Sequence, residues 1–100
     1  GCTQPPEGTV TLEIHEQGKR TIESFKFRGG TPLKLLEEKH NITTTLNNNL
    51  VECIDASCAP LGYWWKPTNN NKTMFQGIKR YKLQHKDAIT FTLTKLQNEN

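Results

Sequence analysis

Two stretches constrain the fold more than any others: GYWWK at residues 62–66 and DAITF at residues 87–91. The first holds both tryptophans side by side. The second begins a run in which Ile89, Phe91 and Leu93 alternate with threonines. Strict alternation of apolar and polar residues is typical of a strand with one buried face. The two stretches therefore predict a small sheet with one open face, whose aromatic residues form either core or contact surface.

The composition limits the size of the core and the classes of partner. One hundred residues suffice for one domain, and only 33% of them are hydrophobic. The 13 basic and 10 acidic residues give a net charge of +3 and are spread along the chain, whereas nucleic-acid binding favours a concentrated basic face. No apolar run approaches the roughly 20 residues needed to span a bilayer. We expect one domain with a polar surface and no nucleic-acid partner.

The first half of the domain reads as a hairpin followed by one helix. Residues 9–15 alternate as a half-buried strand, and the apolar phase of a second strand at 20–27 changes at Glu23-Ser24, which predicts a β-bulge or a local twist. Thr31 is a typical N-cap residue before a helix of about ten residues. Asn41 is expected to end that helix in the left-handed conformation.

The second half reads as short strands joined by asparagine-rich turns. The expected strands are 42–46, 50–55, 63–66 and 89–94. Pro67 should end the third of these, because proline cannot donate to a ladder. Thr90, Thr92 and Thr94 should line the solvent-facing side of the last strand.

This order of elements predicts an α+β fold. With one helix to cover one face, the economical arrangement is a β-grasp, in which a mixed sheet of four to five strands packs on the helix. We expect a flexible N-terminal tether at 1–8, a single β-grasp domain at 9–96 and a frayed tail at 97–100.

The N-terminus has the features of a lipoprotein tether. Gly1 and Cys2 are followed by a polar spacer containing Pro5 and Pro6, and such spacers stay extended and solvated. Cleavage before Cys2 would leave that cysteine to carry a lipid, which predicts a membrane-anchored, extracytoplasmic protein. The alternative is that Gly1 is a tag remnant and Cys2 an ordinary thiol.

Cys53 and Cys58 are separated by four residues, a spacing that suits a disulfide across a short loop. Free thiols and a metal-binding pair are the alternatives. A metal site would need two further ligands, and His15, His40 and His85 are scattered without paired spacing. We expect the disulfide, with no metal and no cofactor.

Several short motifs follow one another in a recognisable order: Trp64-Trp65, Asn70-Asn71-Lys72, Gly77-Ile78, Tyr81-Lys82-Leu83 and Asp87-Ala88-Ile89-Thr90-Phe91. In this order the chain resembles the transcobalamin C-terminal-like domain family. That family is a β-grasp module often attached to bacterial and archaeal surface proteins and lipoproteins. Two positions depart from the pattern: Pro67 begins a segment that is usually apolar, and Lys86 stands where the closing turn usually has glycine. In cobalamin carriers the corresponding domain caps one face of the corrinoid, so the resemblance also implies corrinoid binding as an alternative function.

The aromatic cluster holds the candidate ligand-binding residues Tyr63, Trp64 and Trp65. Neighbouring side chains on a strand point to opposite faces, so one tryptophan can be core while the other lies on the open face or under a loop. An exposed tryptophan is a strong anchor for a ligand. The sequence contains no catalytic triad, phosphate-binding loop or paired-carboxylate signature. We therefore predict a non-catalytic surface binding module for a small ligand, glycan or surface protein, with docking through a sheet edge as the alternative.

Overall fold

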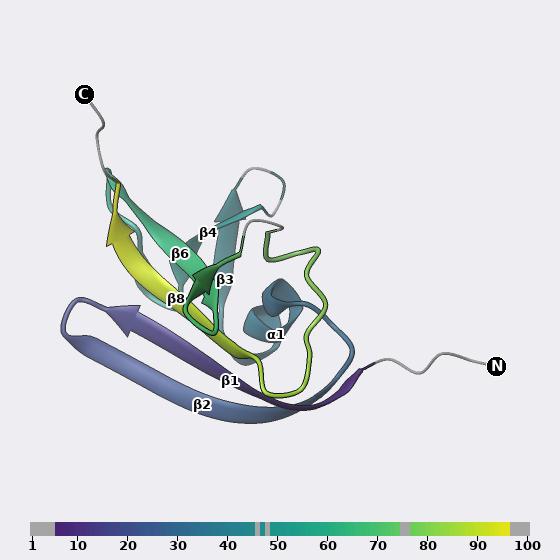
Figure 1. Cartoon of the computed structure of the whole chain (residues 1–100). Helices are drawn as coiled ribbons and strands as arrows, with labels where there is room; N and C mark the ends of the chain where they lie inside the picture. The colour runs from purple at the N-terminus through teal and green to yellow at the C-terminus, as the bar shows by residue number, and fades with distance from the viewer. Residues whose placement is uncertain (1–5, 46, 48, 75–76, 97–100) are drawn as a thin grey trace.

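The computed structural model shows an α+β domain and describes residues 6–45, 47, 49–74 and 77–96 (Figure 1). Predictions for Cys2, for most of the tether and for the tail lie outside this part. The described elements are β1 (Glu7–Glu16), β2 (Lys19–Arg28), α1 (Pro32–Lys39), β3 (Ile42–Thr45), β4 (Leu50–Ile54), β5 (Ser57–Cys58), β6 (Tyr63–Asn69), β7 (Lys72–Thr73) and β8 (Ala88–Lys95). They form a five-stranded sheet in the order β2-β1-β8-β6-β7 and a three-stranded sheet in the order β3-β4-β5. No described helix is long and apolar enough to cross a membrane.

The centre of the larger sheet is the parallel pair β1 and β8. Leu12 lies beside Ile89 and Ile14 beside Phe91 in the register, and all four are buried. Because adjacent residues of paired strands project to the same face, these side chains form one apolar surface. They belong to the same core cluster as the leucines of α1, which lies in the hollow of the curved sheet (Figure 1).

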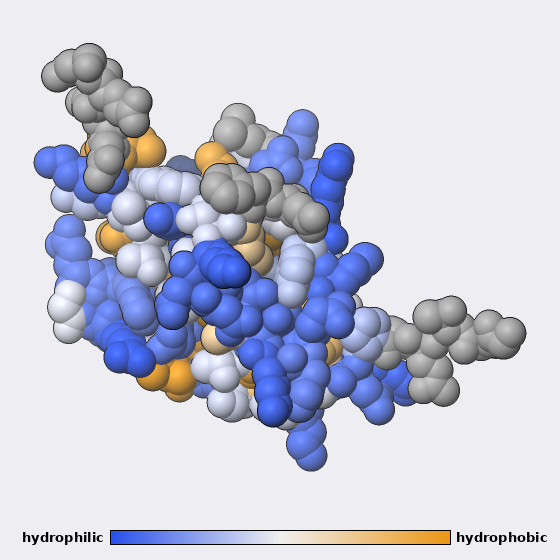
Figure 2. All heavy atoms as spheres, viewed as in Figure 1, coloured by the Kyte–Doolittle hydropathy of each residue, from blue (hydrophilic) through white to orange (hydrophobic). Residues whose placement is uncertain are grey.

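The outer face of these strands is polar but less exposed than expected. Thr90, predicted to face solvent, is only 8% exposed, and its hydroxyl donates to Glu13 Oε2 at 3.2 Å. Arg20 Nε and Nη2 donate to Glu13 Oε1 at 3.1 and 2.9 Å. Burial alone would raise the pKa of Glu13, but the Arg20 and Thr90 contacts outweigh it and hold the pKa below its usual range. The face seen in Figure 2 is mostly hydrophilic, with small separate hydrophobic areas.

The predicted β-bulge near Ser24 is wrong. β1 and β2 pair in antiparallel register without a shift along their whole length. Phe25 and Phe27 lie on the inner face and are half-buried, whereas Ile22 lies on the outer face and is 51% exposed. The apolar phase changes because an isoleucine, Ile22, lies exposed on a regular strand. It does not mark an extra residue in the ladder.

The prediction that Pro67 ends its strand is also wrong, because β6 continues to Asn69. Pro67 lies opposite Phe91 of β8, and its carbonyl accepts from Met74 N at 3.1 Å on the other side. In an antiparallel ladder the N and C=O of one residue point to the same side. The backbone N–H that proline lacks would thus face β7, at the end of the short β6–β7 ladder. The hydrogen bonds between β6 and β8 are therefore unaffected.

The helix begins as predicted and ends earlier. The Thr31 hydroxyl accepts from Lys34 N at 3.3 Å, which confirms the N-cap. α1 has eight residues, and its C-cap is His40 with an extended backbone (φ −141°), so the left-handed stop at Asn41 is wrong. The chain leaves the helix extended because His40 is held by contacts on both sides and β3 starts at Ile42.

His40 ties the two sheets and the helix together. Its ring is 14% exposed; Nε2 lies 3.1 Å from Glu23 Oε1 on β2, and Nδ1 lies 2.7 Å from Asp55 Oδ2 after β4. Asp55 Oδ1 also accepts from Asn41 N at 3.1 Å. The hydrogen bond with His40, opposed by partial burial and aided by the Asn41 amide, holds the pKa of Asp55 below its usual range.

The connection between β7 and β8 closes one end of the core. Its Ile78 and Leu83 are buried. The Ile78 carbonyl accepts from Leu33 N at 2.9 Å, and Leu83 N donates to the Gly30 carbonyl at 3.0 Å. The connection is therefore held to the first turn of α1 and to Gly30 just before it by backbone hydrogen bonds as well as by apolar contact.

Asp87 organises the end of this connection. Its Oδ2 accepts from Gln84 N at 2.7 Å and from the Tyr81 hydroxyl at 2.9 Å, and its Oδ1 accepts from Asn69 Nδ2 at 3.0 Å. Burial and the neighbouring Asp87 carboxylate raise the pKa of Tyr81. Lys86, which replaces an expected glycine, has φ +71°. The turn therefore keeps a left-handed conformation that favours glycine.

The two tryptophans should contribute very differently to stability. Trp65 is 1% exposed, so Trp65→Ala should lower the free energy of unfolding by about 3–5 kcal/mol through a large cavity. Trp64 is half-buried, and Trp64→Ala should cost less than about 2 kcal/mol. Urea unfolding followed by circular dichroism measures both. Equal losses for the two variants would contradict this assignment of the core.

The His40 contacts should make stability depend on acid pH through Asp55. The pKa of Asp55 is lowered in the folded state. The stabilisation that its carboxylate contributes is therefore complete above the ordinary carboxyl range and is lost as pH falls below about 4. Asp55→Asn should cost about 1 kcal/mol at pH 7, a modest value because the carboxylate is half exposed. The difference from wild type should shrink at pH 3, whereas Glu37→Gln, on the exposed side of α1, should show no such trend. A constant difference from pH 7 to 3 would contradict this role for Asp55.

Candidate functional site: a cavity at Trp64

The structure separates the two tryptophans. Trp65 lies opposite Leu93 in the core, and its indole N–H has no hydrogen-bond partner among the described residues. Trp64 lies opposite Thr94 and is half-buried. Since successive side chains on a strand alternate between faces, Trp64 projects away from the core. A ligand can therefore reach Trp64, whereas Trp65 is shielded from it.

Trp64 borders a cavity of about 430 Å³, which we call the Trp64 cavity. Three segments meet there: the start of β4, strand β6 with the end of β7, and the beginning of the connection to β8. The lining residues are Asn49, Leu50, Trp64, Pro67, Thr73, Met74, Gly77 and Arg80. The volume is in the lower part of the range of roughly 300–1,000 Å³ for small-molecule sites.

The chemistry of the lining is apolar with a few polar groups. Trp64, Leu50 and Met74 supply apolar surface, and Asn49 supplies an amide. Among the described lining residues Arg80 is the one charged side chain, and none is acidic. This combination suits a flat apolar group that carries a negative charge, since the guanidinium pairs with anions through a planar set of donors.

The predicted site residues do not all come together. Tyr63 is half-buried and lies opposite Lys95, outside the lining of the Trp64 cavity. Sequence analysis did not single out Asn49 or Arg80, which are 15 residues or more from Trp64 along the chain. Nothing in their local sequence marks them, because only the folding of β4 and the connection beside β6 brings them to the tryptophan.

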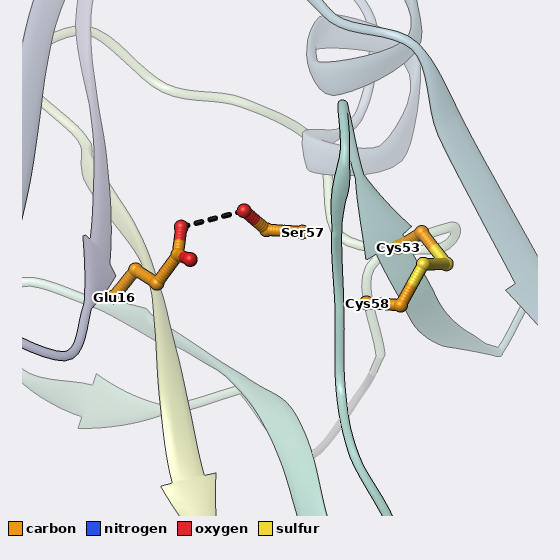
Figure 3. The surroundings of a disulfide bond; sticks show 4 residues. All are labelled: Glu16, Cys53, Ser57 and Cys58. Atoms are coloured by element: carbon orange, nitrogen blue, oxygen red, sulfur yellow. Dashed lines mark hydrogen bonds between the residues drawn. A yellow bond between two sulfur atoms is a disulfide. The ribbon is translucent and has the colours of Figure 1, made fainter.

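The Cys53–Cys58 disulfide is confirmed. The two residues face each other across the antiparallel pair β4 and β5, with a Cα–Cα distance of 3.9 Å. Figure 3 shows the disulfide on one side of β5 and Ser57 pointing to the other, where its hydroxyl donates to Glu16 Oε2 at 2.7 Å. Such a bond is typical of proteins outside the reducing cytoplasm.

The described residues contain no group of three or more histidine, cysteine or acidic side chains arranged to hold a metal ion. His40 lies between two carboxylates, but Glu23 and Asp55 contact opposite nitrogens of its ring. Ligands on opposite edges of an imidazole cannot converge on one ion. The cluster is therefore a link between elements and not a metal site.

Comparisons with known proteins place the fold but not the function. Neither the protein-family profiles nor the curated proteins compared with the sequence give a match. A structure of haptocorrin in complex with Cbi is similar over 97% of this chain, with a TM-score of 0.78 and 12% identity. A protein from Ruminococcus gnavus ATCC 29149, described as a candidate metal-binding protein, is similar over 92% of this chain and 99% of its own, with a TM-score of 0.73 and 18% identity.

These similarities establish a shared fold and a distant structural relationship. The chain spans about a quarter of the haptocorrin chain (27%), whereas it spans nearly all of the bacterial protein. The resemblance seen in the sequence is thus supported at the level of the fold, although membership of the family is not. At such low identity the ligands of these proteins cannot be transferred with the fold.

Single-tryptophan variants should distinguish the two environments. With Trp64→Phe, the remaining Trp65 should emit at short wavelength and resist quenching by iodide, because it is buried. With Trp65→Phe, the remaining Trp64 should emit at longer wavelength and be quenched. Iodide titration of both variants measures the difference. Equal quenching would contradict the placement of Trp64 at an accessible cavity.

Proposed function

We propose that the protein is a non-catalytic binding module that takes a small, flat, anionic ligand in the Trp64 cavity. The observation that carries this proposal is the accessible Trp64 beside Arg80, in a cavity with no acidic lining residue. Stacking on the indole would supply affinity, and the guanidinium would select for a negative group. Asn49 would add a donor and an acceptor at the rim.

The proposed fold is a β-grasp. Its support is the mixed sheet with β1 and β8 parallel at the centre, one helix packed in its hollow, and the similarity to part of haptocorrin. β-Grasp modules of the resembled family are attached to surface proteins. Together with the disulfide, this supports an extracytoplasmic protein anchored by lipid on Cys2. Mass spectrometry of the protein from its own cells would reveal that lipid.

A corrinoid is the second candidate ligand, favoured by the structural similarity to haptocorrin bound to Cbi. A corrinoid is a large macrocycle, and a cavity of about 430 Å³ is too small to enclose it. It would therefore lie across the mouth of the cavity. Contact with one face of the ring fits the capping role implied by the resemblance. Absorbance titration with cobinamide tests this alternative, and Trp64→Ala should weaken any binding.

A dye titration tests the proposed site directly. The probe is 8-anilinonaphthalene-1-sulfonate, which combines flat apolar rings with one negative charge. We expect one dye per protein, and Trp64→Ala and Arg80→Gln should each weaken binding about ten-fold, or about 1.4 kcal/mol. Lys72→Gln, on β7 and outside the lining, is the matched control and should bind as wild type does.

Near-ultraviolet circular dichroism of each variant checks that the core around Trp65 is intact. A folded Trp64→Ala variant that binds the dye as tightly as wild type would overturn the proposed site. Loss of binding in the Lys72→Gln control would instead show that the dye responds to net charge.

A further inference from the structure

Strand β2 lies at one end of the larger sheet and has an open edge. Of the described strands it pairs with β1 alone, and Figure 1 shows it as the outer strand beneath α1. Gly29 N donates to the Pro6 carbonyl at 2.6 Å, so the backbone groups of odd-numbered residues in β2 point to β1. Those of the even-numbered residues, including Ser24, Lys26 and Arg28, point outward. Among the described residues they have no backbone partner.

A groove of about 350 Å³ runs between this edge and α1. Its apolar lining residues are Phe27, Leu35 and Leu83. Its charged lining residues are Lys26, Arg28, Lys34, Lys39 and the single acid Glu38. The groove is therefore an apolar trough with a cationic rim next to unpaired strand backbone.

The cationic side chains, and not the helix N-terminus, give the groove its charge. Leu33 N already donates to the Ile78 carbonyl, and Lys34 N donates to the Thr31 hydroxyl. Lys39 Nζ lies 4.5 Å from the centre of the Phe25 ring, which holds its charge close to the trough. Within the described part of the chain, Arg28 makes a single ion pair, a long and exposed contact of 4.0 Å with Glu7. These cations are available to a partner of opposite charge.

We propose that the edge of β2 binds an extended segment of a partner protein in which acidic and apolar residues alternate. The segment would add a strand to the sheet by pairing with the outward backbone groups of Ser24, Lys26 and Arg28. This surface is separate from the Trp64 cavity and does not depend on the function proposed for it.

The alternation follows from strand geometry. Directly opposed residues of paired strands project to the same face. Segment residues opposite Lys26 and Arg28 would lie beside these cations on the outer face, so they should be acidic. The residue between them would lie opposite Phe27 on the inner face, above the apolar trough, so it should be apolar.

The charge of β2 argues against a second copy of the chain as the occupant. The strand carries Lys19, Arg20, Lys26 and Arg28 against one acid, Glu23. Pairing two such strands would bring cations opposite or next to cations, which is destabilising. An acidic segment converts the same residues into favourable cross-strand pairs.

Peptide binding tests the proposal. The probe is an acetylated octapeptide in which glutamate and valine alternate, and the control has the same composition with all glutamates before all valines. The alternating peptide should bind at least about five-fold tighter, because only it places acids opposite both cations. Methylation of the glutamate backbone nitrogens, which face β2 when the peptide pairs antiparallel, should abolish binding, since it removes the donors needed for strand pairing.

Hydrogen exchange locates the peptide. The alternating peptide should slow exchange at the amides of Ser24, Lys26 and Arg28, which point outward, and leave Phe25 and Phe27 unchanged because they already face β1. The double variant Lys26→Glu and Arg28→Glu should weaken binding at least about ten-fold, since it replaces two attractions with repulsions. The matched control Lys72→Glu with Lys95→Glu has the same change of charge away from β2 and should weaken it less than about two-fold.

Several results would overturn the proposal. Equal affinity for the alternating and blocked peptides, or binding that survives nitrogen methylation, would show simple charge attraction without strand addition. Protection at β7 in place of β2 would locate the peptide at the opposite edge. Dimerisation of the free protein through β2 in sedimentation would identify a second copy as the occupant. Binding of heparin but not of the alternating peptide would make the cations a polyanion surface.

Discussion

One eight-residue helix has to cover the inner face of a five-stranded sheet, and it is too small to do so. A helix of this length spans about 12 Å, whereas five strands at about 4.8 Å spacing extend roughly 19 Å across the sheet. The remaining cover comes from β4, through Val51 and Ile54, and from the connection before β8, through Ile78 and Leu83. These additional segments are held in place by polar contacts, such as that of His40 with Asp55 after β4.

The candidate surfaces lie where this cover ends. At one end, the start of β4, the connection and β6 leave a space between them, and this space is the Trp64 cavity. At the other end, α1 leaves the edge of β2 uncovered, and the groove with its cationic rim lies between them. A small core with cover from several segments thus creates concave sites at its margins.

Local sequence predicted the features that local chemistry determines. Thr31 caps α1 because its hydroxyl reaches the first turn, and the alternation after Ile89 gives β8 its buried face. The opposed projection of Trp64 and Trp65 follows from strand geometry alone. The errors at Pro67 and Asn41 concern partners far away in sequence: whether Pro67 ends a strand depends on which side of it β8 lies. Arg80 was missed for the same reason, because only tertiary packing brings it to Trp64.

The position of the two surfaces in the sheet decides whether their occupants could influence each other. The Trp64 cavity borders β6 and β7, and the groove borders β2, so β1 and β8 lie between them. Direct contact between a small ligand and an added strand is therefore excluded by distance across the sheet. Coupling would require an element with two arrangements that both occupants bias. The parallel pair at the centre is a poor candidate, because Ile89 and Phe91 are fully buried in close-packed surroundings. The fold favours independent action of the two proposed binding surfaces.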